Sequence, residues 1–580
     1  MSLYDKASLI LIPSGAKAET VFSQKPTNGD GDFDFTRATY ATRVNNQGLI
    51  EKERSNLLLQ SNSFDTTWEN VGSNETSGQS GYDGSNNAWL LEVTTSGLSK
   101  YVKQAVVASG IVTFSCYAKA GTTDFFRLQI NGTNTAFGYF DLNNGVSGST
   151  LNEISTNIES VGSSGWYRCS LISQNPSIVQ VRIYVAASTS SISVTQGDNI
   201  YIQDAQLEQN IVATDVIQTT TSAVYEGVTD NVPRLDYSDG DCPSLLLEPQ
   251  RTNLINTSNY FSGWHSDNNS TITLNSTTSP DGTVNASTLE ATGTTEAYVR
   301  DRITLNESAD VTFSFFAKYN TSQYIVAESS FFTGGENARV WFDIQNGNKG
   351  SSNNNDVEYD IIPYGNGWYR CTLTFNISSQ GLSGYCNIKL ADADGNLATT
   401  VGNSAFIFGG QAEEGSYATS YIPTYGTTVT RDNDSCSAGD SDMFNDSEGV
   451  LYTEIAALAA DNADKILRIN SSLSNTYIDL RIDSTPNRFQ MLIKNNNINI
   501  ANKVISVTNY LEFNKVAIRY KQGEVCAIYA NGNKLEEAIG ASLPTGLNVI
   551  QFTNSFEGKV KALYYFNEAL TDQQCIDLTT

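Results

Sequence analysis

Aromatic and charged side chains recur together along this chain in two sets, on strands with a period of two. In the pentapeptide GWYRC, at 165–169 and 367–371, Tyr and Cys share one strand face, which leaves Trp and Arg on the other. Aromatic rings can stack on sugars, and guanidinium and carboxylate groups hydrogen-bond hydroxyls. We therefore predict glycan-binding residues Tyr117, Lys119, Tyr139, Asp141, Trp166 and Arg168 in the first set, and Phe316, Lys318, Trp341, Asp343, Trp368 and Arg370 in the second.

The same side chains also fit a packing role. Trp166 and Trp368 could fold over the edge of a sandwich while each arginine pairs with an acid such as Asp141 or Asp343. Large aromatic residues repeated in diverged modules often serve packing, which favours this second interpretation. Exposure separates the two, because a binding face lies at the surface and a packed face does not.

Catalysis has little support in the sequence. His265 is the one histidine, and it lies beside Trp264 in a turn-rich segment without a nucleophile motif, so a histidine-based triad is not expected. A glycosidase needs two carboxylates at a fixed separation. The C-terminal segment has no Glu-x-Asp-x-x-Glu strand motif. We expect a protein that is not an enzyme.

An internal repeat defines the organisation of the chain. Three matched segments keep their order at an offset of about 200 residues. They are VTFSCYAKA (112–120) with VTFSFFAKY (311–319), YFDLNNG (139–145) with WFDIQNG (341–347), and the two GWYRC pentapeptides. The flanks match as well, NLLLQSNSFDTTW (56–68) with NLINTSNYFSGW (253–264). We predict two similar modules, at 52–240 and 241–432.

The strands predicted within the modules are short and half-buried. Val112, Phe114, Cys116 and Ala118 alternate with side chains that point away from the core. Turn signals such as Asn-Asn-Gly separate the strands, and no long amphipathic helix is predicted. This pattern favours an all-β fold of tandem β-sandwich jelly rolls.

The remaining segments are predicted from the same signals. Residues 449–580 lack the GWYRC unit but alternate on their own, as in KVAIRYK (515–521), and predict a third sandwich. Residues 1–51 hold too few strands to close a core and predict an N-terminal attachment segment. A solvated linker is expected at 433–448, on acidic residues Asp432, Asp434, Asp440, Asp442 and Asp446.

Composition restricts the partners. The net charge of -27 disfavours nucleic acid, because such a surface repels phosphate backbones. No apolar stretch of 18 residues is present, and the N-terminus lacks a basic leader, so we expect neither membrane insertion nor a signal peptide. Eight cysteines in 580 residues is ordinary usage without a Cys-x-x-Cys pair, which predicts reduced thiols.

Three segments resemble recurrent elements of bacteriophage tail and head appendage proteins. They are DFTRATYATRVNNQGLIE (34–51), NVPRLDYSDGDCPSLLLEPQRTNLI (231–255) and EEGSYATSYIPTYGTTVTR (413–431). GKVKALYYFNEALTDQQ (558–574) resembles the closing strand of concanavalin-like and laminin-G-like domains. The resemblance implies a virion structural protein with a C-terminal concanavalin-like sandwich, exposed outside the particle and made in the host cytoplasm.

The two modules also resemble carbohydrate-binding jelly rolls. Members of that family often hold a structural calcium ion through an aspartate of the closing strand, and Asp204 occupies that place in the first module. The second module has Gly409 and Gly410 there, so the resemblance implies calcium in the first module alone. No other cofactor is expected.

The function expected from these observations is that of a tail fibre, head fibre or capsid decoration component that contacts host-surface glycans. Its other partners would be virion proteins, and it would form a homo-oligomer. A purely architectural protein that binds no sugar is one alternative, and a polysaccharide depolymerase is another. Sugar binding separates the first two, and release of reducing sugar identifies the third.

Overall fold

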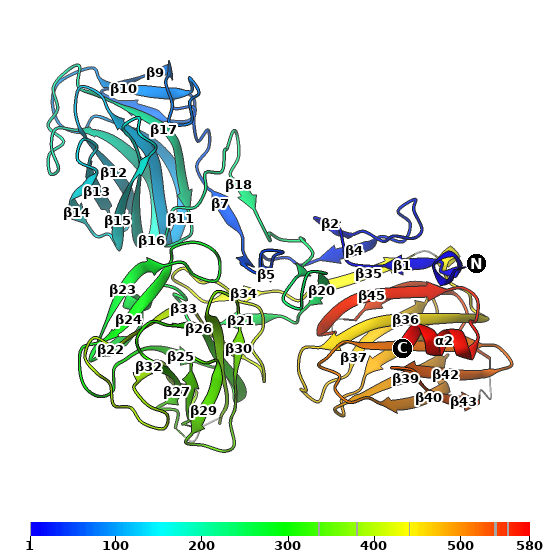
Figure 1. Cartoon of the computed structure of the whole chain (residues 1–580). Coiled ribbons are helices and arrows are strands. Elements are labelled where there is room, and N and C mark those ends of the chain that lie inside the picture. Colours follow the sequence, from blue (N-terminus) through cyan, green and yellow to red (C-terminus); the bar gives the residue numbers. More distant parts are fainter. Residues whose placement is uncertain (1, 334–336, 379–380, 440, 539–541, 554–555) are drawn as a thin grey trace.

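The computed structural model describes residues 2–333, 337–378, 381–439, 441–538, 542–553 and 556–580. It has three β-rich bodies, which confirms the predicted all-β fold of sandwiches (Figure 1). The described helices are the short α1 (Leu3–Lys6) and α2 (Asp572–Thr579) and the 3-10 turns η1 (Phe261–Gly263) and η2 (Ser441–Met443).

Two long strands of the first module cross from one layer of its sandwich to the other. They are β11 (Tyr101–Ala120) and β16 (Trp166–Ala186), which pair along most of their length and break register between Ala105 and Gly110. The remaining strands of this sheet are β8 (Glu69–Val71), β9 (Ser73–Gln79), β10 (Ala88–Val93), β12 (Phe125–Gly132), β13 (Ala136–Asp141), β14 (Val146–Leu151), β15 (Ser155–Val161) and β17 (Asn199–Glu208). As predicted, Val112, Phe114, Cys116 and Ala118 are fully buried.

In the second module each long strand is divided in two. One six-stranded sheet holds β22 (Ser266–Asn268), β25 (Tyr298–Thr304), β27 (Tyr324–Ser330), β28 (Arg339–Asp343), β29 (Asn348–Ser352) and β32 (Ser383–Ala391). The facing sheet holds β23 (Ser270–Thr277), β24 (Ala286–Ala291), β26 (Ala309–Tyr319), β30 (Glu358–Pro363), β31 (Trp368–Ile377) and β33 (Ser404–Glu414). The core between them is apolar, with Phe313, Phe315 and Leu373 fully buried.

The third sandwich recruits strands from three distant parts of the chain. Its first sheet holds β1 (Leu9–Leu11), β19 (Leu235–Asp236), β20 (Ser244–Leu247), β36 (Glu448–Ala457), β41 (Asn514–Lys521), β42 (Val525–Ala530), β43 (Asn533–Ala538) and β45 (Gly558–Phe566). Its second holds β2 (Ala16–Lys17), β3 (Thr20–Val21), β4 (Phe33–Thr36), β35 (Ser435–Gly439), β37 (Lys465–Ser471), β38 (Tyr477–Ile482), β39 (Arg488–Asn495), β40 (Ile498–Ser506) and β44 (Leu547–Phe552).

This recruitment changes the predicted bounds of the third sandwich, and it leaves the predicted attachment role of residues 1–51 a prediction. The expected attachment segment, 1–51, supplies β1 to the closing strand β45 and β4 to β35, because apolar strand residues without a core of their own complete a neighbouring sheet. The expected linker, 433–448, contains β35, which pairs with β4 and β44. The third sandwich is therefore not confined to 449–580.

A matching hairpin and short ribbon precede and close each jelly roll. Before the first module β5 (Arg43–Val44) pairs with β6 (Ile50–Glu51), and β7 (Arg54–Asn56) pairs with β18 (Val224–Glu226). Before the second, β19 pairs with β20, and β21 (Arg251–Asn253) pairs with β34 (Val429–Arg431). Asn56 and Asn253 then donate hydrogen bonds to two backbone carbonyls each, which closes the ends of their modules in the same way.

A buried ion cluster joins segments 34–51 and 231–255 to residues 431–434. Arg37 lies 3.1 Å from Asp434, Arg234 contacts both Asp434 and Glu248, and Arg431 lies 2.9 Å from Glu248. Each of these side chains is at most 4% exposed. Asp434 is therefore not part of a solvated linker, because its carboxylate holds two arginines. Breaking such a pair leaves an uncompensated buried charge, so the cluster fixes how the segments meet.

The other acidic residues of the expected linker differ among themselves. Asp446 accepts hydrogen bonds from the backbone N–H groups of Gly546 and Leu547 at 2.7 and 2.9 Å. Asp432 accepts one from Gln250 at the surface. Asp442 is exposed, and Asp440 lies outside the described residues.

Seven of the eight cysteines are buried, and none is in a disulfide in the structure. Cys242 is the exposed one. Burial raises the pKa of the Cys116 and Cys169 thiols, which face each other across β11 and β16, so both are held in the unreactive thiol form. Within the described residues, no helix is long and apolar enough to cross a membrane.

Candidate functional site

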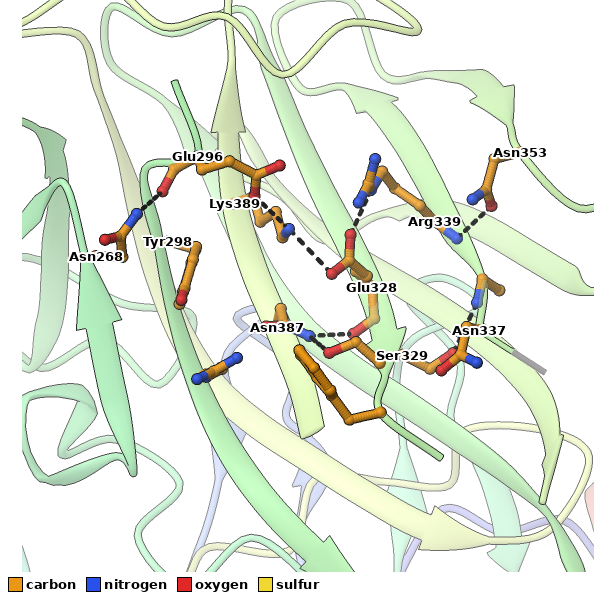
Figure 2. A pocket seen from close by; sticks show the side chains of 14 residues that line it. Asn268, Glu296, Tyr298, Glu328, Ser329, Asn337, Arg339, Asn353, Asn387 and Lys389 are labelled. Carbon is orange, nitrogen blue, oxygen red and sulfur yellow. Dashed lines mark hydrogen bonds and ion pairs between the residues drawn. The ribbon is translucent and has the colours of Figure 1, made fainter. Parts of the chain in front are cut away.

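A groove of about 620 Å³ lies on the outer face of the second module, over the sheet that contains β25, β32, β27 and β28 (Figure 2). The inward-facing neighbours Val299, Ile388 and Ala327 belong to the core, so strand alternation turns the intervening residues outward. The lining residues are Asn268, Glu296, Tyr298, Arg300, Glu328, Ser329, Ser330, Phe331, Asn337, Ala338, Arg339, Asn353, Asn387 and Lys389.

The floor of the groove is polar and ion-paired. Lys389 is 5% exposed and lies 2.7 Å from Glu296 and 2.9 Å from Glu328. Glu328 also contacts Arg339 on the neighbouring strand, and Asn387 donates hydrogen bonds to the Glu328 carbonyl and the Ser330 hydroxyl. These pairs, drawn in Figure 2, neutralise both carboxylates and hold the floor in one arrangement.

One wall of the groove is a guanidinium between aromatic rings. The Arg300 guanidinium lies 4.3 Å from the Tyr385 ring centre, 5.3 Å from that of Tyr298 and 5.6 Å from that of Phe331. Its Nε donates a hydrogen bond to the Ser266 hydroxyl at 2.8 Å. Cation–π contacts and this hydrogen bond fix the plane of the guanidinium.

Phe331 is an unusual residue at the rim. Its side chain is 70% exposed, and its backbone has a φ of 64°. A large non-glycine residue in the left-handed region is strained. Because the phenylalanine ring is exposed, hydrophobic burial does not offset this strain. Strain and exposed apolar surface together are typical of a position that contacts a ligand.

The predicted tryptophans of the GWYRC strands lie elsewhere and are buried. Trp166 is 1% and Trp368 is 2% exposed. Trp368 and Phe316 form a small apolar cluster with Ile50, which reaches this face from the N-terminal segment, and the Trp368 indole donates to the Thr278 carbonyl at 3.2 Å. The prediction that these rings form an exposed platform is therefore wrong, because distant loops cover the sheet.

The two predicted arginines of this face serve the same packing. The Arg168 guanidinium lies 5.4 Å from the Tyr117 ring and donates to the Thr214 carbonyl. Arg370 is 8% exposed, lies 5.4 Å from the Phe316 ring and donates to Ser314. Tyr117 itself stacks on Tyr82 at 3.8 Å, and Lys119 and Lys318 are half-buried beside the tryptophans.

The remaining predicted residues of the second module, Trp341 and Asp343, lie on β28, in the sheet that forms the groove. Trp341 is 4% exposed there and lies 5.9 Å from Arg339, while Tyr139 is 4% exposed in the first module. Asp141 and Asp343 are turn residues, because their carboxylates accept backbone N–H groups two and three residues on. Although burial opposes it, hydrogen bonds from the side-chain amides of Asn144 and Asn346 and from these backbone groups lower the pKa of both aspartates. The structure thus does not gather the twelve residues into one site.

Asp204 occupies a β-bulge rather than a metal site. Its φ is 51°, the equivalent Gly409 has 64°, and the pairing with the neighbouring strand shifts at the same place in both modules. The Asp204 carboxylate accepts hydrogen bonds from Tyr82 and Gln218, and burial raises its pKa. A calcium site needs six to eight oxygen ligands, and among the described residues no group of three His, Cys, Asp or Glu side chains could hold a metal. These residues do not fit calcium.

His265 lies at the edge of the groove and contacts an aromatic residue. Its Nε2 lies 3.2 Å from the Tyr385 hydroxyl, and its backbone N–H donates to Asp301 at 3.3 Å. The ring thus supports Tyr385, which in turn contacts Arg300.

The groove residues were not predicted because the residue types at these positions differ between the two modules. Tyr298-Val299 parallels Tyr101-Val102, but Lys389 and Asn387 stand where the first module has Tyr184 and Arg182. A search for shared aromatic and charged positions therefore passes over them. Short Asn and Ser residues between apolar positions of 384–390 and 325–330 were the available signal.

Comparisons with known proteins give remote similarity only. No family model matches the chain, and no curated protein matches it. Among solved structures, it is similar to the N-terminal CBM22-1–CBM22-2 tandem domain from Paenibacillus barcinonensis Xyn10C, with 11% identity, 62% of this chain and 97% of that chain covered, and a TM-score of 0.21. It is also similar to domains LG4-5 of the mouse laminin alpha1 chain, with 11% identity, 47% and 88% covered, and a TM-score of 0.18. At these scores the superpositions add nothing to the fold seen directly.

Proposed function

We propose that this chain is a structural protein on the exterior of a bacteriophage particle, and that its second module binds a host-surface glycan in the groove over β25, β32, β27 and β28. The observation that carries the binding role is the groove itself, with exposed Phe331, the Arg300 guanidinium and a fixed polar floor. Sugars present apolar C–H faces and hydroxyl edges. A wall of rings above paired polar side chains is complementary to both.

The virion role is supported by the sequence elements and by charge. The segments that resemble phage appendage elements supply Arg37, Arg234, Glu248 and Arg431 of the buried cluster, and Asp434 follows the last of them by three residues. A net charge of -27 keeps such a protein from packaged DNA. The proposal includes other virion proteins and further copies of this chain as partners. Mass spectrometry of purified particles, with and without protease treatment of intact virions, tests this part.

The proposal is non-enzymatic. Glu296 and Glu328, the carboxylates of the groove, are both held by Lys389. A glycosidase needs two carboxylates that are free to act on the glycosidic bond, whereas both carboxylates of the groove are engaged in ion pairs. Release of reducing sugar from a bound polysaccharide would replace this part of the proposal by a depolymerase.

The binding test uses the matched tyrosines of the two modules. Tyr298→Ala removes a ring from the groove wall and is expected to weaken glycan binding by about 1–3 kcal/mol, the range for an aromatic contact residue. Tyr101→Ala removes the equivalent ring from the first module and should leave binding unchanged. Glycan-array screening followed by calorimetry on the best glycan measures both.

An architectural protein without sugar binding is the second candidate. The burial of Trp166 and Trp368 favours it, because the aromatic residues shared by the modules serve packing. If the full chain binds no glycan on the array while remaining folded and present in particles, this second candidate replaces the first.

A further inference from the structure

We propose that the groove selects acidic polysaccharides, with the anionic group of a sugar bound by Arg300. This inference rests on the proposed glycan-binding function and adds the class of ligand. It starts from the charges of the groove, where the cations Arg300, Arg339 and Lys389 accompany the carboxylates Glu296 and Glu328.

Of the three cations that line the groove, Arg300 is the one that is not in an ion pair with any described residue. Lys389 contacts both carboxylates, and Arg339 contacts Glu328. Among the described residues, no carboxylate lies at ion-pair distance from Arg300, whose side-chain hydrogen bond is the one from Nε to Ser266. The N–H groups of its two terminal nitrogens, Nη1 and Nη2, are therefore available to donate hydrogen bonds to a ligand. A half-buried guanidinium without a carboxylate is a strong site for an anion.

The geometry around Arg300 suits an anion attached to a ring. Tyr385, Tyr298 and Phe331 hold the guanidinium plane, and the fork of two amino groups matches a carboxylate or sulfate bidentately. Phe331 is 70% exposed at the rim, where it can contact the ring that carries the anionic group. Both contacts lie on one wall, so a single sugar unit can make them together.

The first module has a paired cation at the position that matches Arg300. Lys103 occupies the position of Arg300, and its ammonium lies 2.9 Å from Glu69. The whole chain has a net charge of -27, so a polyanion is repelled by the average surface. Binding of an acidic polymer therefore requires a local site, and Arg300 supplies it.

The test compares polymers that differ only in charge. Full-length protein is titrated with polygalacturonate and its carboxyl-reduced form, and with dextran sulfate and dextran. Arg300→Gln is compared with Arg302→Gln, which removes an exposed arginine of the same strand outside the groove lining. Arg300→Lys keeps the charge but loses the fork.

We expect an acidic polymer to bind at least tenfold more tightly than its neutral partner, and Arg300→Gln to lose about ten- to a hundredfold in affinity. Arg302→Gln should stay within about twofold, and Arg300→Lys should fall between the two. Binding by the wild type should weaken with added salt more than binding by Arg300→Gln. The polymer that binds identifies a carboxylate or a sulfate as the anion.

Two results overturn the inference, and they are distinguishable. If neutral and acidic polymers bind equally and Tyr298→Ala weakens both while Arg300→Gln weakens neither, the groove binds glycan without charge selection. If no polymer or array glycan binds to folded protein, the inference fails together with the proposed function. Unchanged thermal unfolding of Arg300→Gln shows that a loss of binding is not a loss of structure.

Discussion

The same sheet is open in the second module and filled in the first. In the first, the Arg127 guanidinium lies 4.0 Å from the Tyr184 ring and 4.8 Å from that of Phe137, and Arg182 lies 4.7 Å from that of Tyr101. The side chains thus satisfy one another on the sheet surface. The register places Lys389, Arg339 and Asn387 where the first module has Tyr184, Phe137 and Arg182.

The difference lies in the side chains that cover the sheet. Each change replaces a large planar side chain by a shorter or a charged one, so the sheet surface is no longer covered by its own residues. The core beneath is unaffected, because alternate residues face it. The two modules thus differ at this face in the side chains that cover it, while the strand pairing is the same.

The modules also differ in how they are anchored. Glu248 of the second module holds Arg234 and Arg431 at 4% exposure or less, whereas the matching Glu51 holds Arg43 at 2.9 Å with the pair 30% and 22% exposed. Buried and exposed ion pairs respond differently to the loss of one partner. The second module, which carries the groove, is thus the one held by the buried cluster.

The largest expected effect comes from breaking this anchor. Glu248→Gln leaves Arg234 and Arg431 without their shared carboxylate and is expected to lower the free energy of unfolding by about 3–5 kcal/mol. Glu51→Gln, the matched change, should cost less than about 1 kcal/mol. Chemical denaturation of both variants measures the contrast. Equal effects would show that burial of the cluster has no energetic consequence.

The pH dependence follows from the same carboxylate. Although burial opposes it, Arg431 and Arg234 hold the pKa of Glu248 well below its ordinary value of 4.5. A lowered folded-state pKa contributes stability above the unfolded value and loses it as the pH falls. The stability difference between wild type and Glu248→Gln should therefore shrink below about pH 4.5. A difference that grows on acidification would contradict this assignment.

A smaller effect is expected from filling the groove with a side chain taken from the first module. Asn387→Arg places the equivalent of Arg182 between Tyr298 and Glu328 and should reduce glycan binding at least tenfold, about 1.4 kcal/mol. The loss of two Asn387 hydrogen bonds should cost about 1–3 kcal/mol of stability. Calorimetric titration and thermal unfolding separate the two. Unchanged binding would mean that the ligand site lies elsewhere.

The smallest effect is expected from uncovering the first module. Arg127→Leu removes the cation from between Tyr184, Phe137 and Tyr139 and should cost about 1–2 kcal/mol. Its Nε is buried without a hydrogen-bond partner in the structure, which limits the loss. Glycan binding should not change, since the groove lies in the other module. A loss of binding would assign a site to the first module as well.

The sequence predicted the two modules and the aromatic, cationic and acidic residue types, but neither the module nor the residues of the groove. The repeat located the jelly rolls, and the two-residue period correctly turned Trp368 and Arg370 away from the core of their sandwich. The pattern could not tell that Ile50, more than 300 residues earlier, packs against Trp368. Alternation predicts which side chains of a strand point to the core and which point away. Whether the side chains that point away are buried depends on which other segments pack against them.

The amino-acid sequence by itself determined the local structure: the strands, the Asp-x-x-Asn-Gly turns that begin at Asp141 and Asp343, and the cysteines at apolar strand positions. These features depend on neighbours a few residues away. The tertiary structure alone decided that Arg37, Arg234 and Asp434 meet in a buried cluster, and that no carboxylate of the described residues pairs with Arg300 in the groove wall. Charge pairing and exposure depend on distances between remote segments, and these are set only when the sheets pack.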